Sequence, residues 1–230
     1  MISTMRWLLV VLVWTTELVS ASELMLCVVT ARRSTSYLPQ LIAGLEGEGA
    51  DFMVVDVDNS TMPSVHAFRF GERTQQACRV GPVPCVVQRQ ALDVASALEV
   101  CASEHSTGRW VALVEDDMAV CPGAVEMMER VLLELGSFKT ARFAKFSRAV
   151  VLPVENIEPY VDFVRQKVHM VPYDILLNFE WAEGQDYVHH ESLFAHRGSV
   201  STIEERNNPA YMATYSDLRG EECGSRLVGK

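Results

Sequence analysis

Short uninterrupted hydrophobic runs alternate along the chain with segments whose hydrophobic positions recur at helical spacing. The uninterrupted runs predict buried strands over 24–30, 52–57 and 109–114. The helical spacing predicts helices over 36–45, 88–103 and 122–135. The last of these opens at Pro122, because proline is tolerated in the first turn of a helix. This alternation predicts an α/β fold with a mostly parallel central sheet and helices on both faces.

The rest of the pattern is less regular. Prolines and Gly71 interrupt the segment 59–84, which we expect to be a long irregular loop of the kind that is usually functional. Beyond the third helix, the sequence predicts a strand near 142–146 and a helix near 155–168. Hydrophobic segments follow at 173–181 and 192–196.

Composition and charge describe an ordinary globular domain. The chain has 230 residues, of which 49% are hydrophobic and 22% charged, with 30 acidic against 20 basic residues. An acidic chain without a basic stripe argues against a nucleic-acid partner, since phosphate backbones are held by clustered Lys and Arg. We expect a catalytic domain over 22–208 and a loose polar tail over 209–230.

The amino terminus has the layout of a secretory signal. Arg6 precedes a hydrophobic run over 7–14, and a polar stretch leads to Val19-Ser20-Ala21. The run is far shorter than the roughly 20 residues that span a membrane. We therefore interpret residues 1–21 as a cleaved signal peptide, with a short signal anchor as the alternative. Either predicts a chain in the lumen of the secretory pathway, in the Golgi or secreted, with the membrane contacted only through that anchor.

Six cysteines would lie in an oxidising compartment under this interpretation, which permits disulfides. Cys27 and Cys101 fall in hydrophobic patterns and are expected to be plain buried thiols. Cys78 and Cys85 flank a Gly-Pro loop that a disulfide between them would close. Asn59-Ser60-Thr61 is an N-glycosylation sequon in a polar turn, as expected of a lumenal glycoprotein.

The most informative cluster is Glu115-Asp116-Asp117, which directly follows the predicted strand 109–114. Adjacent carboxylates repel one another, so their placement at the end of a buried strand favours a role in binding a cation. Ligands of open α/β sheets bind at that edge. A solvated acidic turn is the alternative, but the buried strand before it and the helix after it favour the cation site.

In this context, Val114-Glu115-Asp116-Asp117 resembles the metal motif of GT-A glycosyltransferases. Further motifs resemble, in order, those of the N-acetylglucosaminyltransferase IV family, also called glycosyltransferase family 54. They are Thr30-Ala31-Arg32-Arg33 with Ser36-Tyr37-Leu38, Arg89-Gln90-Ala91-Leu92-Asp93, Phe146-Ser147, Pro172-Tyr173-Asp174-Ile175-Leu176-Leu177, and Ser192-Leu193-Phe194-Ala195-His196-Arg197-Gly198 with Ser201. The resemblance covers about residues 24–205. It implies a GT-A fold and transfer of GlcNAc from UDP-GlcNAc, in β1,4 linkage, to a mannose of a glycoprotein N-glycan.

The resemblance also implies roles for individual residues. Asp117 and His196 would bind Mn²⁺, which neutralises charge on the departing UDP. The residues expected at the donor nucleotide are Thr30, Arg33, Asp56, Asp58, Arg89, Asp93, Glu115 and Asp116. For Asp56 and Asp58, a helix-capping or turn role is an equal alternative.

An inverting transfer needs a carboxylate that takes the proton of the acceptor hydroxyl. Asp174 is the candidate base, and a helix N-cap is the competing role. Members of the family often carry a second aspartate four positions later, where this chain has Asn178. Asp186 and Glu191 are the reserve candidates.

A second departure from the family, besides Asn178, keeps other functions open. The family usually has a further lectin-like domain, for which this sequence has no counterpart, so the acceptor is the least secure part of the prediction. The alternatives are an enzyme similar to the GPI-anchor GalNAc transferases, which share the acidic motif, and a secreted nucleotide- or sugar-binding protein of the same fold without turnover.

Overall fold

The computed structural model describes residues 22–31, 37–57, 67–69, 78–144, 149–172, 176–197, 222–224 and 226. The strands are β1 (Leu24–Thr30), β2 (Phe52–Asp56), β3 (Ala67–Arg69), β4 (Trp110–Glu115), β5 (Met118–Val120), β6 (Thr140–Arg142), β7 (Ala149–Pro153), β8 (Asp186–Val188) and β9 (Phe194–His196). The helices are α1 (Leu38–Gly47), α2 (Cys85–Glu104), α3 (Ala124–Glu134) and α4 (Ile157–Lys167), with a 3₁₀ turn η2 (Val154–Asn156) and a π-helix η3 (Leu176–Trp181).

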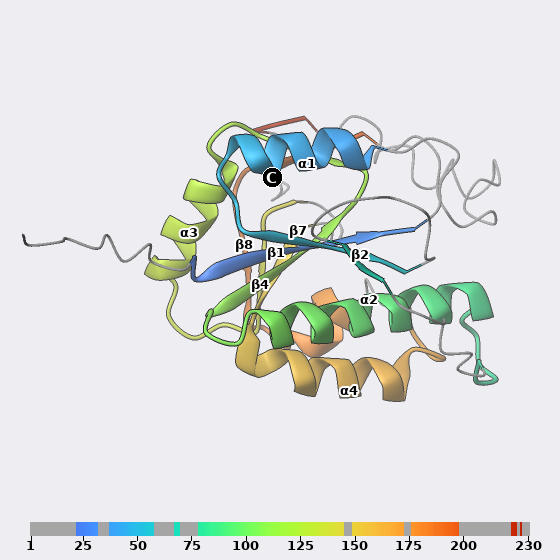
Figure 1. Cartoon of the computed structure of the whole chain (residues 1–230). Helices are drawn as coiled ribbons and strands as arrows, with labels where there is room; N and C mark the ends of the chain where they lie inside the picture. The colour runs from blue at the N-terminus through green and yellow to red at the C-terminus, as the bar shows by residue number, and fades with distance from the viewer. Residues whose placement is uncertain are drawn as a thin grey trace, which may run out of the picture.

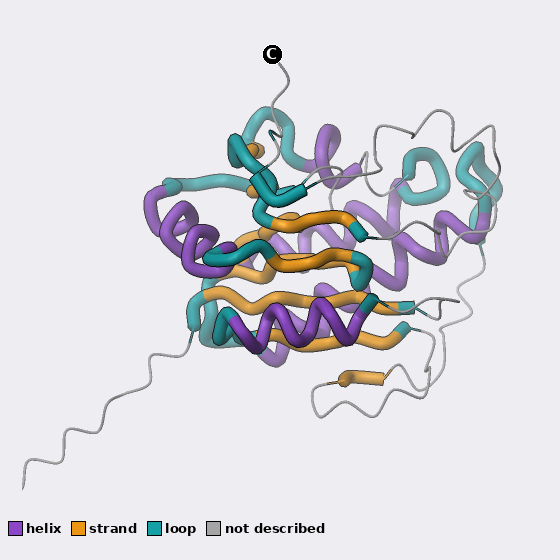
Figure 2. Tube along the Cα trace, turned by 90° about the horizontal axis from the view of Figure 1, so that it is seen from above, coloured by secondary structure: helices purple, strands orange, loops and turns teal. Residues whose placement is uncertain are grey.

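Within the described residues, seven strands form one sheet in the order β3-β2-β1-β4-β7-β6-β8. The strands β3, β2, β1 and β4 are parallel neighbours, and β6 is parallel to β8. Only β7 runs against both of its neighbours, β4 and β6. Seen from above, the strands lie side by side across the molecule (Figure 2). The prediction of a mostly parallel central sheet is confirmed.

Helices cover both faces of this sheet, as the sequence predicts (Figure 1). Alternate residues of a strand point to opposite faces, so β1 contributes to two hydrophobic layers. Leu24, Leu26 and Val28 pack in the layer under α1 and α3. Met25 and Cys27 pack in the layer under α2 and α4. Because both faces are buried, the strands read as continuous hydrophobic runs rather than as alternating ones.

The register of the parallel strands brings their carboxyl ends to one edge. Thr30, the last residue of β1, lies opposite Asp56, the last residue of β2. Glu115, the last residue of β4, lies opposite Val29. The polar residues that end these three strands are therefore neighbours, at what we call the carboxyl edge of the sheet.

Several elements differ from the sequence prediction. One strand was expected near 142–146, but the chain forms the antiparallel pair β6 and β7, and β7 lies inside the sheet beside β4. The strands β3, β5 and β8 were not predicted, because three residues are too few to show a period. The helix α2 begins at Cys85 rather than at Gln88, and α3 begins after Pro122 and Gly123.

All six cysteines are in disulfides, Cys27–Cys101, Cys78–Cys85 and Cys121–Cys223. The expectation that Cys27 and Cys101 are plain buried thiols is wrong. Both are fully buried in the layer between the sheet and α2, where a half-cystine fits the hydrophobic pattern as well as a thiol does.

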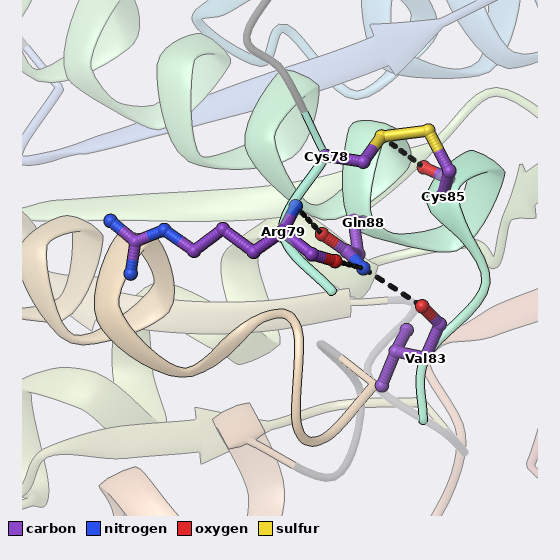
Figure 3. The surroundings of a disulfide bond; sticks show 5 residues. All are labelled: Cys78, Arg79, Val83, Cys85 and Gln88. Carbon is purple, nitrogen blue, oxygen red and sulfur yellow. Dashed lines mark hydrogen bonds between the residues drawn. A yellow bond between two sulfur atoms is a disulfide. The ribbon is translucent and has the colours of Figure 1, made fainter. Parts of the chain in front are cut away.

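Cys78 and Cys85 are bonded to each other and close the Gly-Pro loop, as their positions in the sequence allowed (Figure 3). The side chain of Gln88 supports the same loop from the first turns of α2. Its amide nitrogen donates to the carbonyl oxygens of Arg79 and Val83 at 2.9 and 2.8 Å, and its oxygen accepts from the Arg79 backbone N–H at 3.1 Å. The loop that precedes α2 is thus fixed by one covalent bond and three hydrogen bonds.

Several predictions fall outside the described residues: the signal segment 1–21, the sequon at Asn59, and the site residues Arg33, Asp58 and Asp174. In the part of the chain that the structure describes, no helix is both long and apolar enough to cross a bilayer.

Candidate functional site at the carboxyl edge

The acidic triplet lies where the sequence predicts it, at the end of a buried strand. Glu115 ends β4, and Asp116 and Asp117 form the turn that leads directly into β5. Asp116 and Asp117 are only 2% and 6% exposed, whereas Glu115 is half-buried. A solvated acidic turn would expose these carboxylates. Their burial therefore favours a binding role over the alternative.

Thr30 positions one of the carboxylates. Its hydroxyl donates a hydrogen bond to Asp116 Oδ2 at 2.7 Å, although the two residues are 86 positions apart. Thr30 itself is 5% exposed, and its backbone carbonyl accepts from the N–H of Val57, just after β2. The sequence analysis placed Thr30 at the donor nucleotide. The structure gives it a second role, as the residue that orients Asp116, and the sequence offered no signal of this contact.

Asp117 meets His196 at the same turn. The strands β5 and β9 form a separate antiparallel pair in which Met118 lies opposite His196. Beyond this pair, the N–H of Arg197 donates to the carbonyl oxygen of Asp117 at 2.8 Å. His196 Nε2 lies 3.3 Å from Asp117 Oδ2, and both side chains are almost buried, at 11% and 8% exposure. The two residues that the resemblance pairs as metal ligands are thus brought together by the fold.

The donor set fits a divalent cation that is completed by a substrate. A carboxylate oxygen and an imidazole nitrogen 3.3 Å apart can reach one ion between them, and both donor types suit Mn²⁺. Among the described residues, no group of three His, Cys, Asp or Glu side chains is arranged to hold a metal on its own. Ions of this class commonly take one or two protein carboxylates and the phosphate oxygens of a nucleotide. A metal held by Asp117 and His196 would be of that open kind.

The other predicted donor residues that the structure describes lie toward the same edge of the sheet and differ in burial. Asp56 lies beside Thr30 in the sheet and is 2% exposed. It ends β2, and the next residue, Val57, is in a turn, which agrees with the turn alternative. Arg89 is exposed and Asp93 half-buried, one and two turns into α2. Because α2 ends beside Glu23 at the opposite edge of the sheet, its first turns lie toward the carboxyl edge.

The two reserve bases lie in different surroundings. Asp186 forms an ion pair with Arg142 across β8 and β6, with 2.6 Å between Oδ2 and the guanidinium nitrogen, and both side chains are mostly buried. A carboxylate held in this way has to leave its ion pair before it can reach an acceptor hydroxyl. Glu191 lies in the segment between β8 and β9, with its side chain 51% exposed, and among the described residues His190 at 4.0 Å is its possible ionic partner. Glu191 is therefore the better of the two.

No known family model matches this chain, and no curated protein matches it in sequence. Solved structures are similar to it in fold. A glycosyltransferase involved in the glycosylation of the major capsid of PBCV-1 is similar with a TM-score of 0.52 and 11% sequence identity, over 80% of this chain and 97% of that chain. A putative nucleotide-diphospho-sugar transferase from Desulfovibrio desulfuricans G20 gives a TM-score of 0.45 and 12% identity, over 74% of this chain and 80% of that one.

The likeness to the capsid-modifying enzyme extends over nearly the whole of that protein, and at this identity it concerns the fold. The prediction of a GT-A glycosyltransferase fold is confirmed.

Proposed function

We propose that the chain is an inverting, metal-dependent glycosyltransferase that moves GlcNAc from UDP-GlcNAc to a mannose of an N-glycan in β1,4 linkage. The observation that carries the proposal is the meeting of Asp117 and His196 at the carboxyl edge of a GT-A fold. The donor sugar, the acceptor and the linkage come from the motif resemblance to the N-acetylglucosaminyltransferase IV family.

The local chemistry supports a nucleotide diphosphate as the donor. Asp117 and His196 would hold the Mn²⁺ ion, which supplies charge neutralisation to the diphosphate leaving group. Thr30 keeps Asp116 oriented beside them. Buried carboxylates at one turn repel one another, and a dication bound between them and the two phosphates of UDP reduces that repulsion.

The transfer itself requires one proton acceptor. The acceptor hydroxyl oxygen attacks the anomeric carbon, the bond from that carbon to the UDP oxygen breaks with its electron pair, and the hydroxyl proton passes to a carboxylate. Asp174 is our candidate for this base, with Glu191 in reserve. Asn178 cannot take the proton, so the reaction would rely on a single carboxylate.

Three disulfides support a lumenal setting. Disulfides persist in oxidising compartments and are rare in the cytosol. We therefore keep the secretory pathway, and the Golgi in particular, as the proposed location, with glycoprotein acceptors as partners.

The test is UDP release by the purified lumenal chain with Mn²⁺, from a panel of UDP-sugars, with and without mannose-terminated N-glycans. We expect release from UDP-GlcNAc that is stimulated by the acceptor and by Mn²⁺. The variant Asp117→Ala should lose it. The variant His190→Ala, which changes an exposed histidine on the segment that leads to β9, should keep it.

Each other outcome selects an alternative. Release from UDP-GalNAc with a GPI glycan would favour an enzyme similar to the GPI-anchor GalNAc transferases. Mn²⁺-dependent UDP binding without turnover of any donor would contradict the enzyme proposal and favour a binding protein of the same fold.

A further inference from the structure

The histidine of the site stands on a short strand. The strands β5 and β9 pair over three residues each and belong to a two-stranded sheet apart from the main one. Met118 and Phe194, one from each strand, are fully buried in the layer under α1 and α3, which anchors the pair to the domain. A two-stranded pair of this length is marginally stable in water when it is isolated, so support at its ends adds to this packing.

A short C-terminal segment, residues 222–224 and 226, supplies that support, and we call it the strap. Its Cys223 is bonded to Cys121, which directly follows β5. The N–H of Gly224 donates to the carbonyl oxygen of Ser192 at 3.0 Å. Arg226 forms a backbone bridge with Glu191. The polar tail, expected to be loose, is attached to the domain at these residues.

The strap acts at one end of the strand pair and the site lies at the other. In the antiparallel register, Val120 lies opposite Phe194 and Met118 lies opposite His196. The strap joins Cys121, just beyond Val120, to Ser192, two residues before Phe194. The Cys121 N–H also donates to the Leu193 carbonyl oxygen at 3.1 Å, and the Ser192 hydroxyl donates to the Phe194 carbonyl oxygen at 2.7 Å.

We propose that the Cys121–Cys223 disulfide and its strap are positioning elements that hold His196 in reach of Asp117, so that reducing this bond weakens metal binding at the site. The structural half of the inference, that the strap fixes β9 on β5, stands on the contacts alone. The metal half rests on the proposed function.

The first experiment measures the structural half without any metal. Amide hydrogen exchange of the metal-free chain is followed at residues 118–120 and 194–197. We expect Cys121→Ser with Cys223→Ser to raise exchange there by about 10-fold or more, because local opening no longer has to break the strap. The matched pair Cys78→Ser with Cys85→Ser removes a disulfide of the loop before α2 and should leave these amides unchanged. Equal exchange in both double variants would overturn the inference.

The second experiment measures Mn²⁺ affinity from the electron paramagnetic resonance signal of the free ion. We expect a dissociation constant about 10-fold to 100-fold weaker in the Cys121/Cys223 double variant, the range seen when groups that orient metal ligands are lost. The Cys78/Cys85 variant should stay near the parent value. A disulfide that only stabilises the fold would lower the melting temperature without this selective loss of affinity.

A milder variant covers the case in which the double cysteine variant does not fold. Gly224 has a positive φ of 77°, and a Cβ there would meet no atom within 4 Å. Gly224→Ala therefore strains only the backbone that donates to Ser192. We expect it to raise exchange at 194–197 by about fivefold to 30-fold, in line with the cost of a left-handed alanine. No increase would overturn the inference.

The outcomes separate this inference from the proposed function. If the parent chain binds no Mn²⁺ but the strap variants open the β5–β9 pair, the metal proposal fails and the structural role of the strap holds. If Mn²⁺ binds and the strap variants change neither exchange nor affinity, the strap inference fails and the metal proposal holds.

Discussion

Polar and charged residues are arranged differently at the two edges of the sheet. At the amino edge, the carbonyl oxygen of Glu23 accepts from the N–H groups of Arg109 and Trp110, each at 2.9 Å, and from the ring of His105 at 3.2 Å. The Arg109 and Glu23 side chains form an exposed ion pair across the same edge. Donors and acceptors, and opposite charges, are matched there within the protein itself.

The carboxyl edge gathers like charges in a small volume. Glu115, Asp116 and Asp117 are consecutive, two of them are buried, and Asp56 lies close by in the sheet. Thr30 and His196 each engage one of these carboxylates. A cluster of adjacent carboxylates at a strand end suits a cationic or cation-bound ligand at this edge.

The largest effect is expected from removing a charge at the crowded edge. Asp117→Asn should lower kcat/KM of the proposed transfer by about 100-fold or more, a size typical of losing one preorganised electrostatic group. In the metal-free chain it should raise the free energy of unfolding by about 1 kcal/mol, because it relieves repulsion. Kinetic assays and chemical denaturation check the two halves.

At the matched edge, Glu23→Gln should leave kcat/KM unchanged and lower the unfolding free energy by only about 0.5 kcal/mol, as for exposed ion pairs. If Asp117→Asn lowered stability in the metal-free chain more than Glu23→Gln does, the comparison between the edges would break.

Two histidines sharpen the comparison, one at each edge. His196→Ala should weaken Mn²⁺ binding by about 10-fold or more and change stability little. His105→Ala should leave Mn²⁺ binding unchanged and lower the free energy of unfolding by about 1–3 kcal/mol, because a buried ring loses its hydrogen bond and its packing. Metal titration and denaturation of both variants check this. If both variants changed Mn²⁺ affinity and the free energy of unfolding in the same way, the comparison would be contradicted.

Thr30 tests whether orientation of the acidic turn matters. Thr30→Val keeps the shape and removes the hydroxyl that donates to Asp116, so we expect donor affinity to fall by about 10-fold, or ~1.4 kcal/mol. Thr30→Ser keeps the hydroxyl and should retain most of the affinity. UDP titration in the presence of Mn²⁺ distinguishes the two variants, and equal losses would instead indicate a packing role.

The smallest effect concerns pH. Burial, with a smaller contribution from the neighbouring His190, lowers the pKa of His189 below its usual value, against an opposing effect of Glu191. Below pH 6.5 the unfolded chain takes up this proton more readily than the folded one, so stability falls as the pH drops from about 7 toward 5. His189→Gln should flatten that part of the curve of unfolding free energy against pH. An unchanged slope would show that other groups produce it.

The sequence predicts the parallel half of the fold best. The strands β1, β2 and β4 agree with the prediction to within a residue or so at each end, because strands buried on both faces give continuous hydrophobic runs. The separation of β6 from β7 was not predicted, and neither was the antiparallel direction of β7. Strand direction depends on the connection between the strands, which the hydrophobic pattern of the strands does not encode.

For the site, what could be predicted depended on the distance along the chain. The acidic triplet is contiguous, so its position at a strand end could be predicted from the local sequence. The pairing of Asp117 with His196 spans 79 positions and was available only through the motif resemblance. The contact of Thr30 with Asp116 and the disulfide of Cys27 with Cys101 are equally distant, and nothing in the local pattern distinguishes a bonded Thr or Cys from one that is not.

The most direct test of the central claim is UDP binding measured by calorimetry on the whole chain, with and without Mn²⁺, beside the Asp117→Asn variant. The claim is that the carboxyl edge is a metal-dependent site for a nucleotide diphosphate. It predicts that UDP binds tightly only when Mn²⁺ is present and that Asp117→Asn abolishes the dependence on Mn²⁺. UDP affinity that is the same with and without Mn²⁺, or that is unchanged in the variant, would contradict it.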